Sequence, residues 1–198
     1  KLIFFSTSEV YGPNLKKMDE NISDPNPNNI YGLTKLLGEK LVEYEVSNGD
    51  LEAVSIRPFM MYDENEDLGD HRSAMIRFAT NLFLGKKIEI HNNSARGWLH
   101  VSDAVKAIEA ATRVKKYKKI NIGHPDIKPI KVLAEKIRKE LGASKKLIKY
   151  VNLPTKMTLT KYPSLKNQKL YLKVTPKVSL DQGIKLVCDS IKKRLKNY

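Results

Sequence analysis

The chain has 198 residues, of which 41% are hydrophobic and 29% charged, a composition typical of a globular rather than a disordered protein. No apolar run approaches the roughly 20 residues that a membrane-spanning helix needs, so we expect no membrane association. The single cysteine, Cys188, excludes an internal disulfide and favours a reducing compartment, which predicts a cytoplasmic protein.

The net charge of +14 is distributed unevenly. Residues 115–198 contain 23 basic and 5 acidic side chains, whereas residues 1–114 contain 13 and 17. This asymmetry leaves open a non-catalytic alternative, a basic nucleic-acid-binding or scaffold protein. However, 29 of the 36 basic residues are lysines, and nucleic-acid recognition relies on arginine forks and interleaved aromatic rings. We therefore favour a solvated lysine-rich surface and expect no nucleic-acid partner.

The first third of the chain has the order strand, helix, strand, which is typical of a parallel α/β sheet. These elements are predicted over residues 2–5, 30–46 and 53–56, with a Pro- and Asn-rich loop over 13–29. Apolar residues recur at helical spacing and support this helix: Ile30, Leu33, Leu37, Leu41 and Tyr44.

The rest of the chain alternates helices and short strands. Helices are predicted over 73–84, over 102–114 with Ser102 as N-cap, over 130–141 ending at Gly142, and from Ser179 onward; strands are predicted over 87–91 and 119–122. The proline-containing stretch 143–177 is predicted to be irregular.

One pair of residues in the first helix has the spacing of an acid–base site. Tyr31 and Lys35 are four residues apart, so their side chains share one helix face. An ammonium beside a phenol favours the phenolate, which can act as a general base. The preceding strand ends at Thr7-Ser8-Glu9, and open α/β sheets bind their ligands at the carboxyl ends of strands. Thr7 is therefore a candidate hydrogen-bond partner of a substrate oxygen, and Glu9 a candidate second acid or base.

Each of these patterns has a simpler alternative. Tyr162 and Lys166 have the same spacing, which shows that spacing alone is weak evidence; there, Pro163 follows the tyrosine and argues against a helix. The Ser-Thr-Ser-Glu segment alone would form a turn or a helix cap.

Ordered segments along nearly the whole chain match one family. They are Ser6–Gly12, Tyr31-x-x-x-Lys35, Arg57-Pro58-Phe59-x-x-Tyr62, Arg96–Asp103, Ile120–Gly123 and Thr175–Ile184. With these segments the chain resembles the extended short-chain dehydrogenase/reductases, and more narrowly the NAD-dependent nucleotide-sugar epimerases, dehydratases and decarboxylases.

The resemblance implies an active site. Thr7, Tyr31 and Lys35 match the Ser/Thr-Tyr-Lys triad: Tyr31 would remove the proton of a sugar 4-hydroxyl while hydride passes to the nicotinamide of NAD. Lys35 would support the phenolate and contact the nicotinamide ribose, and Pro58 would also lie at the cofactor. Glu9 matches an acid of the sugar 4,6-dehydratases and UDP-glucuronate decarboxylases, so decarboxylation is kept as an alternative to epimerase/dehydratase chemistry.

The resemblance also implies a site for a nucleoside-diphosphate sugar. By this resemblance, Ser8 would contact the substrate and Arg96 would bind its diphosphate. Arg72 would also bind the diphosphate; the alternative for Arg72 is a salt bridge to the acidic loop before it. Met60 stands where the family usually has an asparagine that touches the substrate. Lys161 stands where relatives often have arginine, and lysine lacks the arginine fork. No histidine or cysteine has metal-ligand spacing, so no metal is expected.

The implied fold is the second half of a Rossmann-type parallel sheet plus a smaller α/β substrate-binding domain. Residues 1–60 and 99–123 would form the first domain, and residues 61–98 and 124–198 the second. The glycine-rich dinucleotide loop is absent, so we expect a truncated chain that lacks the N-terminal dinucleotide-binding half and is inactive alone. The intact parent protein is expected to be a homodimer paired through the helix that bears Tyr31.

Overall fold

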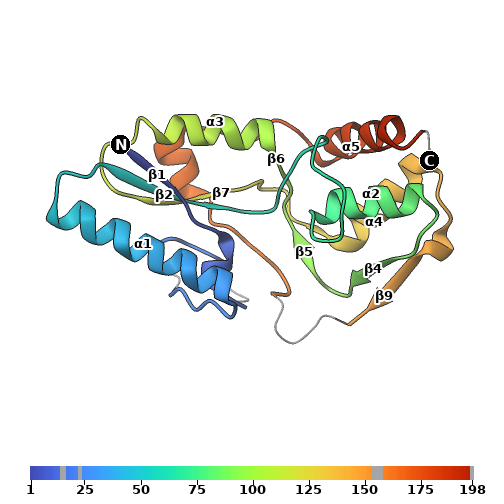
Figure 1. Ribbon diagram of the computed structural model, residues 1–198, viewed down its shortest axis with the longest axis horizontal. Helices are drawn as coiled ribbons and strands as arrows, with labels where there is room; N and C mark the ends of the chain where they lie inside the picture. Colours follow the sequence, from blue (N-terminus) through green and yellow to red (C-terminus); the bar gives the residue numbers. More distant parts are fainter. Residues whose placement is uncertain (14–16, 22–23, 153–157, 197–198) are drawn as a thin grey trace.

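The computed structural model describes residues 1–13, 17–21, 24–152 and 158–196. Three parallel strands form the main sheet in the order β1-β2-β7 (Figure 1). Their bounds are β1 Leu2–Phe5, β2 Ala53–Pro58 and β7 Lys119–Ile122. Two helices, α1 (Ile30–Asn48) and α3 (Val101–Ala111), lie on opposite sides of these strands. The predicted parallel α/β architecture is confirmed.

A second group of elements packs beside the sheet. Helices α2 (Ala74–Phe83), α4 (Ile130–Leu141) and α5 (Leu180–Arg194) contact one another, next to a parallel pair of strands, β4 (Ile88–His91) and β9 (Ile148–Val151). Two-residue ladders join β3 (Met61–Tyr62) to β6 (Leu99–His100), and β5 (Ala95–Arg96) to β8 (Lys128–Pro129). The remaining short helices are η1 (Ser8–Tyr11), η2 (Lys145–Leu147) and the π-helix η3 (Gln168–Leu172).

Buried apolar side chains form two large clusters. One lies between the sheet and α3 and includes Ile56 and Ile120; the other lies among α2, α4, α5 and β4 and includes Leu133 and Ile184. Each such side chain contributes about 1.5–3 kcal/mol when it leaves water. Leu172 of η3 packs with the first cluster although it lies in the second predicted domain range. The domain division itself stays a prediction.

The helix ends test the predicted caps. Gly142 follows α4 with a φ of 65° and Ser179 caps α5, both as predicted. Gln182 completes a capping box with Ser179, which the sequence analysis did not include. Helix α3 differs, because His100 rather than Ser102 is its N-cap and accepts a hydrogen bond from the Ser102 amide at 3.2 Å. The prediction that 143–177 is irregular was wrong for β9 and η3.

Helix α1 leaves exposed the apolar residues whose spacing predicted it. Ile30 is 75% exposed and Leu41 67%, and Leu33, Leu37 and Tyr44 are exposed as well. The buried residues of α1 are of mixed character: Gly32, Glu39 and Val42. Gly38 lets the helix approach β1, because a Cβ there would lie 2.4 Å from the Phe4 ring. The helix predicted from this periodicity is confirmed, and its apolar stripe is not part of the core.

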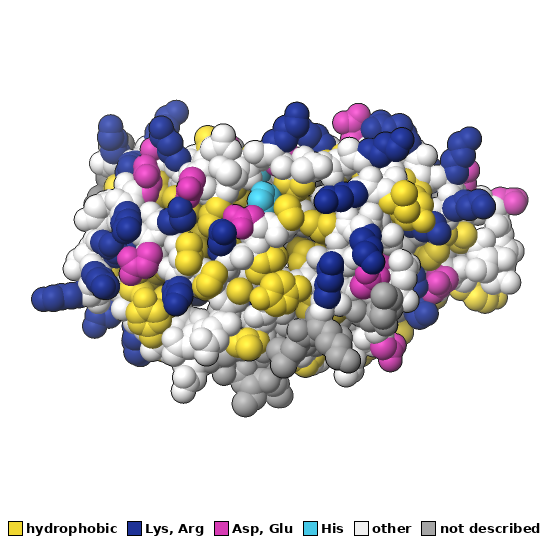
Figure 2. Space-filling view, turned by 180° about the vertical axis from the view of Figure 1, so that it is seen from behind, with side chains coloured by type: hydrophobic (Ala, Val, Ile, Leu, Met, Phe, Trp, Pro, Cys, Tyr) yellow, Lys and Arg dark blue, Asp and Glu magenta, His cyan; other side chains and the backbone are white. Residues whose placement is uncertain are grey.

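The charged surface is mixed. Lysine and arginine side chains are spread over the face shown in Figure 2, and acidic side chains lie among them. Several lysines are paired across elements, such as Lys136 with Asp181 and Lys149 with Glu89. Among the residues that the structure describes, no helix is both long enough and apolar enough to cross a membrane.

Candidate active site

The end of β1 continues into a capped turn that carries three candidate residues. Thr7 is buried and its hydroxyl accepts a hydrogen bond from the Glu9 amide at 3.2 Å, which starts η1. Gly12 ends η1 with a φ of 64°, and a Cβ there would lie 1.8 Å from the Asn26 carbonyl oxygen. Only glycine meets both conditions without strain. Thr7, Ser8 and Glu9 therefore lie in a fixed turn at the carboxyl end of a parallel strand.

The first turn of α1 packs directly on this turn. Asn29 caps α1 by accepting from the Gly32 amide at 2.8 Å, and its side-chain amide donates to Glu9 at 3.3 Å. A Cβ at Gly32 would lie 2.7 Å from the Glu9 carbonyl oxygen, so a larger residue would push the helix away. The glycine that follows Tyr31 thereby sets the distance between α1 and Glu9.

Tyr31 and Lys35 lie together on the exposed side of this contact. Tyr31 is 51% exposed, and the Lys35 ammonium lies 5.9 Å from its ring centroid and 5.5 Å from that of Phe4. Lys35 also donates a hydrogen bond to the Phe5 carbonyl oxygen at 2.8 Å, which ties it to the end of β1. The pair predicted from sequence is thus brought together, with the lysine held by the strand that leads to Thr7.

Glu9 faces a lysine from a distant part of the chain. The buried Lys161 ammonium donates to the Glu9 carboxylate and, at 3.1 Å, to the Ser8 hydroxyl. Burial alone would raise the pKa of Glu9, but Lys161, Asn29 and the nearby charge of Arg96 outweigh it and lower that pKa. Burial lowers the pKa of Lys161, and Glu9 opposes this shift. Glu9 is therefore held as a carboxylate at neutral pH.

Replacing Lys161 by glutamine is expected to raise the pKa of Glu9, because it removes the ammonium that outweighs the burial of the carboxyl. In the wild type, the lowered pKa of Glu9 adds stability above its ordinary value of 4.5, and this contribution is lost as the pH falls through the folded-state value. Carbon-13 NMR of labelled glutamate, with Glu9→Gln to assign the signal, measures the change. An unchanged Glu9 titration would contradict the pairing.

The other predicted ligand residues have different surroundings. Arg96 is buried and donates to the carbonyl oxygens of Ala95 at 2.8 Å and Leu159 at 2.7 Å, and also to that of Thr158. Arg72 pairs with Asp67 at 2.9 Å. This is the salt bridge to the acidic loop that the sequence analysis named as the alternative to diphosphate binding. The roles of both arginines toward a diphosphate stay predictions.

Two more predicted residues lie where the main sheet ends. Pro58 is the last residue of β2, next to β1, and is half-buried. Met60 follows with a φ of 39°, a left-handed conformation that a methionine rarely adopts. Asparagine tolerates this region, which gives a physical reason for the asparagine that the family usually carries there. Met60 packs against the helical core cluster.

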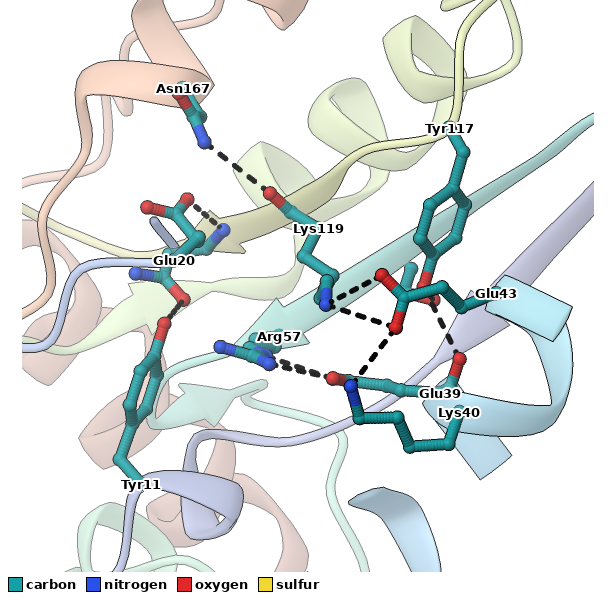
Figure 3. Close-up of polar contacts among 11 residues, drawn as sticks. Tyr11, Glu20, Glu39, Lys40, Glu43, Arg57, Tyr117, Lys119 and Asn167 are labelled. Atoms are coloured by element: carbon teal, nitrogen blue, oxygen red, sulfur yellow. Dashed lines mark hydrogen bonds and ion pairs between the residues drawn. The ribbon is translucent and has the colours of Figure 1, made fainter. Parts of the chain in front are cut away.

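A buried polar network that sequence reasoning missed joins α1, β2 and η1, and Figure 3 shows its side chains. Glu39 of α1 forms a two-bond ion pair with Arg57 of β2 at 2.8 and 2.6 Å, and both side chains are 1% exposed. The Arg57 guanidinium lies 4.7 Å from the ring centroid of Tyr11, whose hydroxyl donates to Asn121 at 2.9 Å. The sequence contained one signal for Glu39, because it follows Tyr31 and Lys35 at the same four-residue interval. In the structure, its side chain lies on the helix side that faces the sheet.

Glu20 lies at the edge of this network and has a raised pKa. Its carboxylate accepts from the Asn121 backbone amide at 2.6 Å, and burial raises the pKa of Glu20 to about 6 from its ordinary 4.5. A raised carboxyl pKa means that the folded state holds the proton more tightly. The resulting stability is complete below pH 4.5 and is lost as the pH rises through about 6.

Replacing Glu20 by glutamine is therefore expected to stabilise the protein at neutral pH by about 1–2 kcal/mol. The amide oxygen can still accept from Asn121, and no buried charge has to form. Urea unfolding at several pH values should show the two proteins equally stable near pH 4.5 and the variant more stable near pH 8. A constant difference across this range would show that Glu20 titrates normally.

One trio of possible metal ligands occurs among the described residues. Ligand atoms of Asp63, Glu64 and His100 lie within 4.8 Å of one another. Both ring nitrogens of His100 are already hydrogen-bonded, to Glu64 and to Ser102, each at 2.8 Å. These contacts account for the histidine as the N-cap of α3, and the expectation of no metal stays a prediction.

Comparisons with known proteins place this geometry in a family. The chain is 30% identical to an uncharacterized protein of Methanocaldococcus jannaschii over 96% of its own length and 58% of that protein. It is 28% identical to a UDP-N-acetyl-alpha-D-glucosaminuronate decarboxylase of Bacillus cytotoxicus, over 93% of this chain and 61% of the relative. The chain thus spans less than two thirds of these relatives.

A solved structure shows the same fold. The UDP-glucuronic acid 4-epimerase of Bacillus cereus in complex with NAD superposes with a TM-score of 0.82 at 26% identity, covering 99% of this chain and 60% of that one. Residues 1–123, which include β1, α1, β2 and β7, match the sequence profile of a family described as NAD dependent epimerase/dehydratase. The resemblance inferred from the motifs is therefore confirmed, and the chain belongs to the NAD dependent epimerase/dehydratase family.

Proposed function

We propose that this chain carries the catalytic residues and the sugar-nucleotide site of an NAD-dependent nucleotide-sugar epimerase/dehydratase. The observation that supports it most is the arrangement of α1 against η1. Tyr31 and Lys35 lie on one helix turn, and Gly32 and Asn29 of the same turn hold Glu9 at hydrogen-bond range. A base, its supporting cation and a second acid–base group thus meet at the carboxyl end of β1.

The residues at this end of the sheet fit NAD as cofactor. Tyr31 is half-exposed, and Lys35 has one hydrogen-bond acceptor among the described residues, so its ammonium retains donors for the ribose hydroxyls. Pro58 ends the adjacent strand. When bound, NAD accepts a hydride from the sugar and returns it.

The protein groups would then act on protons. The Tyr31 phenolate accepts the proton of the sugar 4-hydroxyl, Lys35 stabilises the phenolate charge, and the Thr7 hydroxyl donates to the same sugar oxygen. Loss of the hydride and this proton leaves a 4-keto sugar. Glu9, held as a carboxylate by Lys161, can accept a further proton next to the ketone. Removal of that proton serves dehydration, in which a hydroxyl two carbons from the ketone leaves as water, more than plain 4-epimerisation. Decarboxylation, the alternative, loses CO2 instead and needs a proton donor for the resulting enolate.

The substrate class follows from the cations around Glu9. Arg96 and Lys161 lie on the segments that face η1, and both are buried. Together with Ser8, Met60 and Arg72, they are our proposed contacts for a nucleoside-diphosphate sugar. We also propose the two-domain division stated above, and a homodimer of the parent protein through the exposed apolar stripe of α1.

Thermal melting of the 198-residue chain with UDP, dTDP, GDP and CDP tests the substrate site. We expect one nucleoside diphosphate to raise the melting temperature, since a ligand at 100 times its Kd adds about 2.7 kcal/mol. Inorganic pyrophosphate is the control for simple attraction to a chain of charge +14. A cooperative melt that no nucleotide shifts beyond pyrophosphate would refute the sugar-nucleotide site.

A further inference from the structure

The buried network in Figure 3 contains groups to which the proposed mechanism gives no role. We call Glu39, Arg57, Tyr11 and Asn121 the buried relay. Its links are the Glu39–Arg57 ion pair, the Arg57–Tyr11 stacking contact and the hydrogen bond from the Tyr11 hydroxyl to Asn121. All four side chains are at most 1% exposed. A ligand could not reach them, so their role must be exerted through other residues.

The relay touches every segment that carries a candidate catalytic group. Glu39 belongs to α1, two turns after Tyr31, and Tyr11 closes η1, two residues after Glu9. Asn121 reaches the segment of Lys161, because its side-chain amide donates to the carbonyl oxygens of Ser164 at 3.2 Å and Met18 at 3.0 Å. Met18 in turn pairs through its backbone with Tyr162 and Ser164.

The Asn121 side chain links Tyr11 to the segment of Lys161. The Tyr11 hydroxyl donates to the Asn121 side-chain oxygen, so the side-chain nitrogen must point toward Ser164 and Met18. Burial raises the pKa of Tyr11 to about 12, which keeps the hydroxyl protonated and able to donate. Without that donor, the buried Asn121 oxygen would lose the hydrogen bond that Tyr11 supplies, and the link from η1 to the segment of Lys161 would be broken.

Stability alone does not explain this arrangement. A buried ion pair is often no more stabilising than apolar residues of the same volume, because both charges must leave water. Its geometry links three elements: the two hydrogen bonds of the arginine fork join β2 to α1, and the guanidinium over the Tyr11 ring joins β2 to η1.

We propose that Tyr11 and Arg57 are positioning residues that hold η1 and the segment around Lys161 in register with α1, so that Glu9 meets both Asn29 and Lys161. This proposal rests on the proposed function: it states how the groups of that site are kept aligned, and the proposed reaction is the reason why their alignment matters. The alignment itself can be measured without any reaction.

The contact between Glu9 and Lys161 provides the readout. Glu9 faces Lys161, Arg96, Asn29 and Ser8, and its pKa is lowered chiefly by Lys161 against the effect of burial. If Tyr11 aligns the two segments, Tyr11→Phe should loosen the Glu9–Lys161 pair and raise the Glu9 pKa. The change should have the same direction as in Lys161→Gln, and be smaller.

The matched control is Tyr117→Phe. The Tyr117 hydroxyl also bridges elements, bonding to Ser55 at 3.0 Å and donating to the Glu39 carbonyl oxygen at 3.4 Å, but it lies at the opposite end of the strands from Glu9. Both variants lose one hydroxyl and keep the ring. Carbon-13 NMR titration of Glu9 and thermal melting are measured for both, with Lys161→Gln as the reference for a fully broken pair.

We expect both Tyr→Phe variants to melt earlier than the wild type, and only Tyr11→Phe to raise the Glu9 pKa. Equal Glu9 titrations in the two variants would reduce Tyr11 to an ordinary stabilising residue and overturn the proposal. Because the titration uses no nucleotide, an absence of nucleotide binding would refute the proposed function and leave this result intact.

Discussion

Replacing Glu39 by alanine is expected to lower the free energy of unfolding by about 3–5 kcal/mol. The substitution leaves the Arg57 guanidinium buried, at 1% exposure, without its carboxylate. One of its nitrogens, Nη1, already has no hydrogen-bond partner among the described residues, so the protein offers no ready replacement. In the wild type, Glu39 raises the pKa of Arg57 against the effect of burial, so its removal takes away a contact that stabilises the buried charge.

Glu43, one turn later on the same helix, provides the control. It pairs with Lys40 at 3.1 Å and Lys119 at 3.2 Å, but its side chain is 36% exposed. Exposed pairs of this kind contribute about 0–1 kcal/mol, so Glu43→Ala should cost far less than Glu39→Ala. Urea unfolding followed by circular dichroism measures both. Similar losses would mean that water reaches Arg57 and that the pair is not buried in solution.

A double replacement separates stability from alignment. Glu39→Leu combined with Arg57→Met removes both charges and keeps most of the volume, which is often neutral or stabilising for a buried pair. We expect this variant to regain much of the stability that Glu39→Ala loses. If the buried relay aligns the site, the same variant should still show an altered Glu9 titration.

Local sequence signals predicted the helices well. Gly142 and the Ser179 cap mark ends that depend only on neighbouring residues, and both were read correctly. Strand β9 was missed because its partner is β4, about 60 residues earlier, and its own sequence, Ile148–Val151, has no strong alternation. The exposed stripe on α1 shows the same limit, since periodicity identifies an apolar face and not what covers it.

In the candidate site, too, contacts between sequence neighbours were predicted and contacts between distant segments were not. Tyr31 and Lys35 are neighbours on one helix turn, so their spacing was enough to bring them together. Glu9 and Lys161 are 152 residues apart, and Tyr11 and Asn121 are 110 apart, so only the folded chain reveals these contacts. Lys161 was predicted as a substrate contact, whereas its first partners are Ser8 and Glu9. The role of a buried charge depends on what the fold places opposite it.

The second large effect is expected at Tyr31. In the parent enzyme loaded with NAD, Tyr31→Phe should lower the turnover of the nucleotide sugar by about 10²- to 10⁴-fold, because the ring remains and the proton acceptor is lost. Nucleotide binding should persist, since the phenol acts on the sugar hydroxyl rather than on the diphosphate. Turnover and the melting shift with the nucleoside diphosphate are measured on the same preparation.

Tyr162→Phe is the control that separates chemistry from spacing. Tyr162 also precedes a lysine by four residues and is 44% exposed, close to the 51% of Tyr31. It lies outside any helix, so Lys166 does not share a helix face with it. Of the two tyrosine–lysine pairs, Tyr31 and Lys35 are the pair that a helix holds against Glu9 and the end of β1. Turnover that falls in Tyr31→Phe and not in Tyr162→Phe therefore assigns the base to the helix, whereas equal turnover in both would remove Tyr31 from the chemistry.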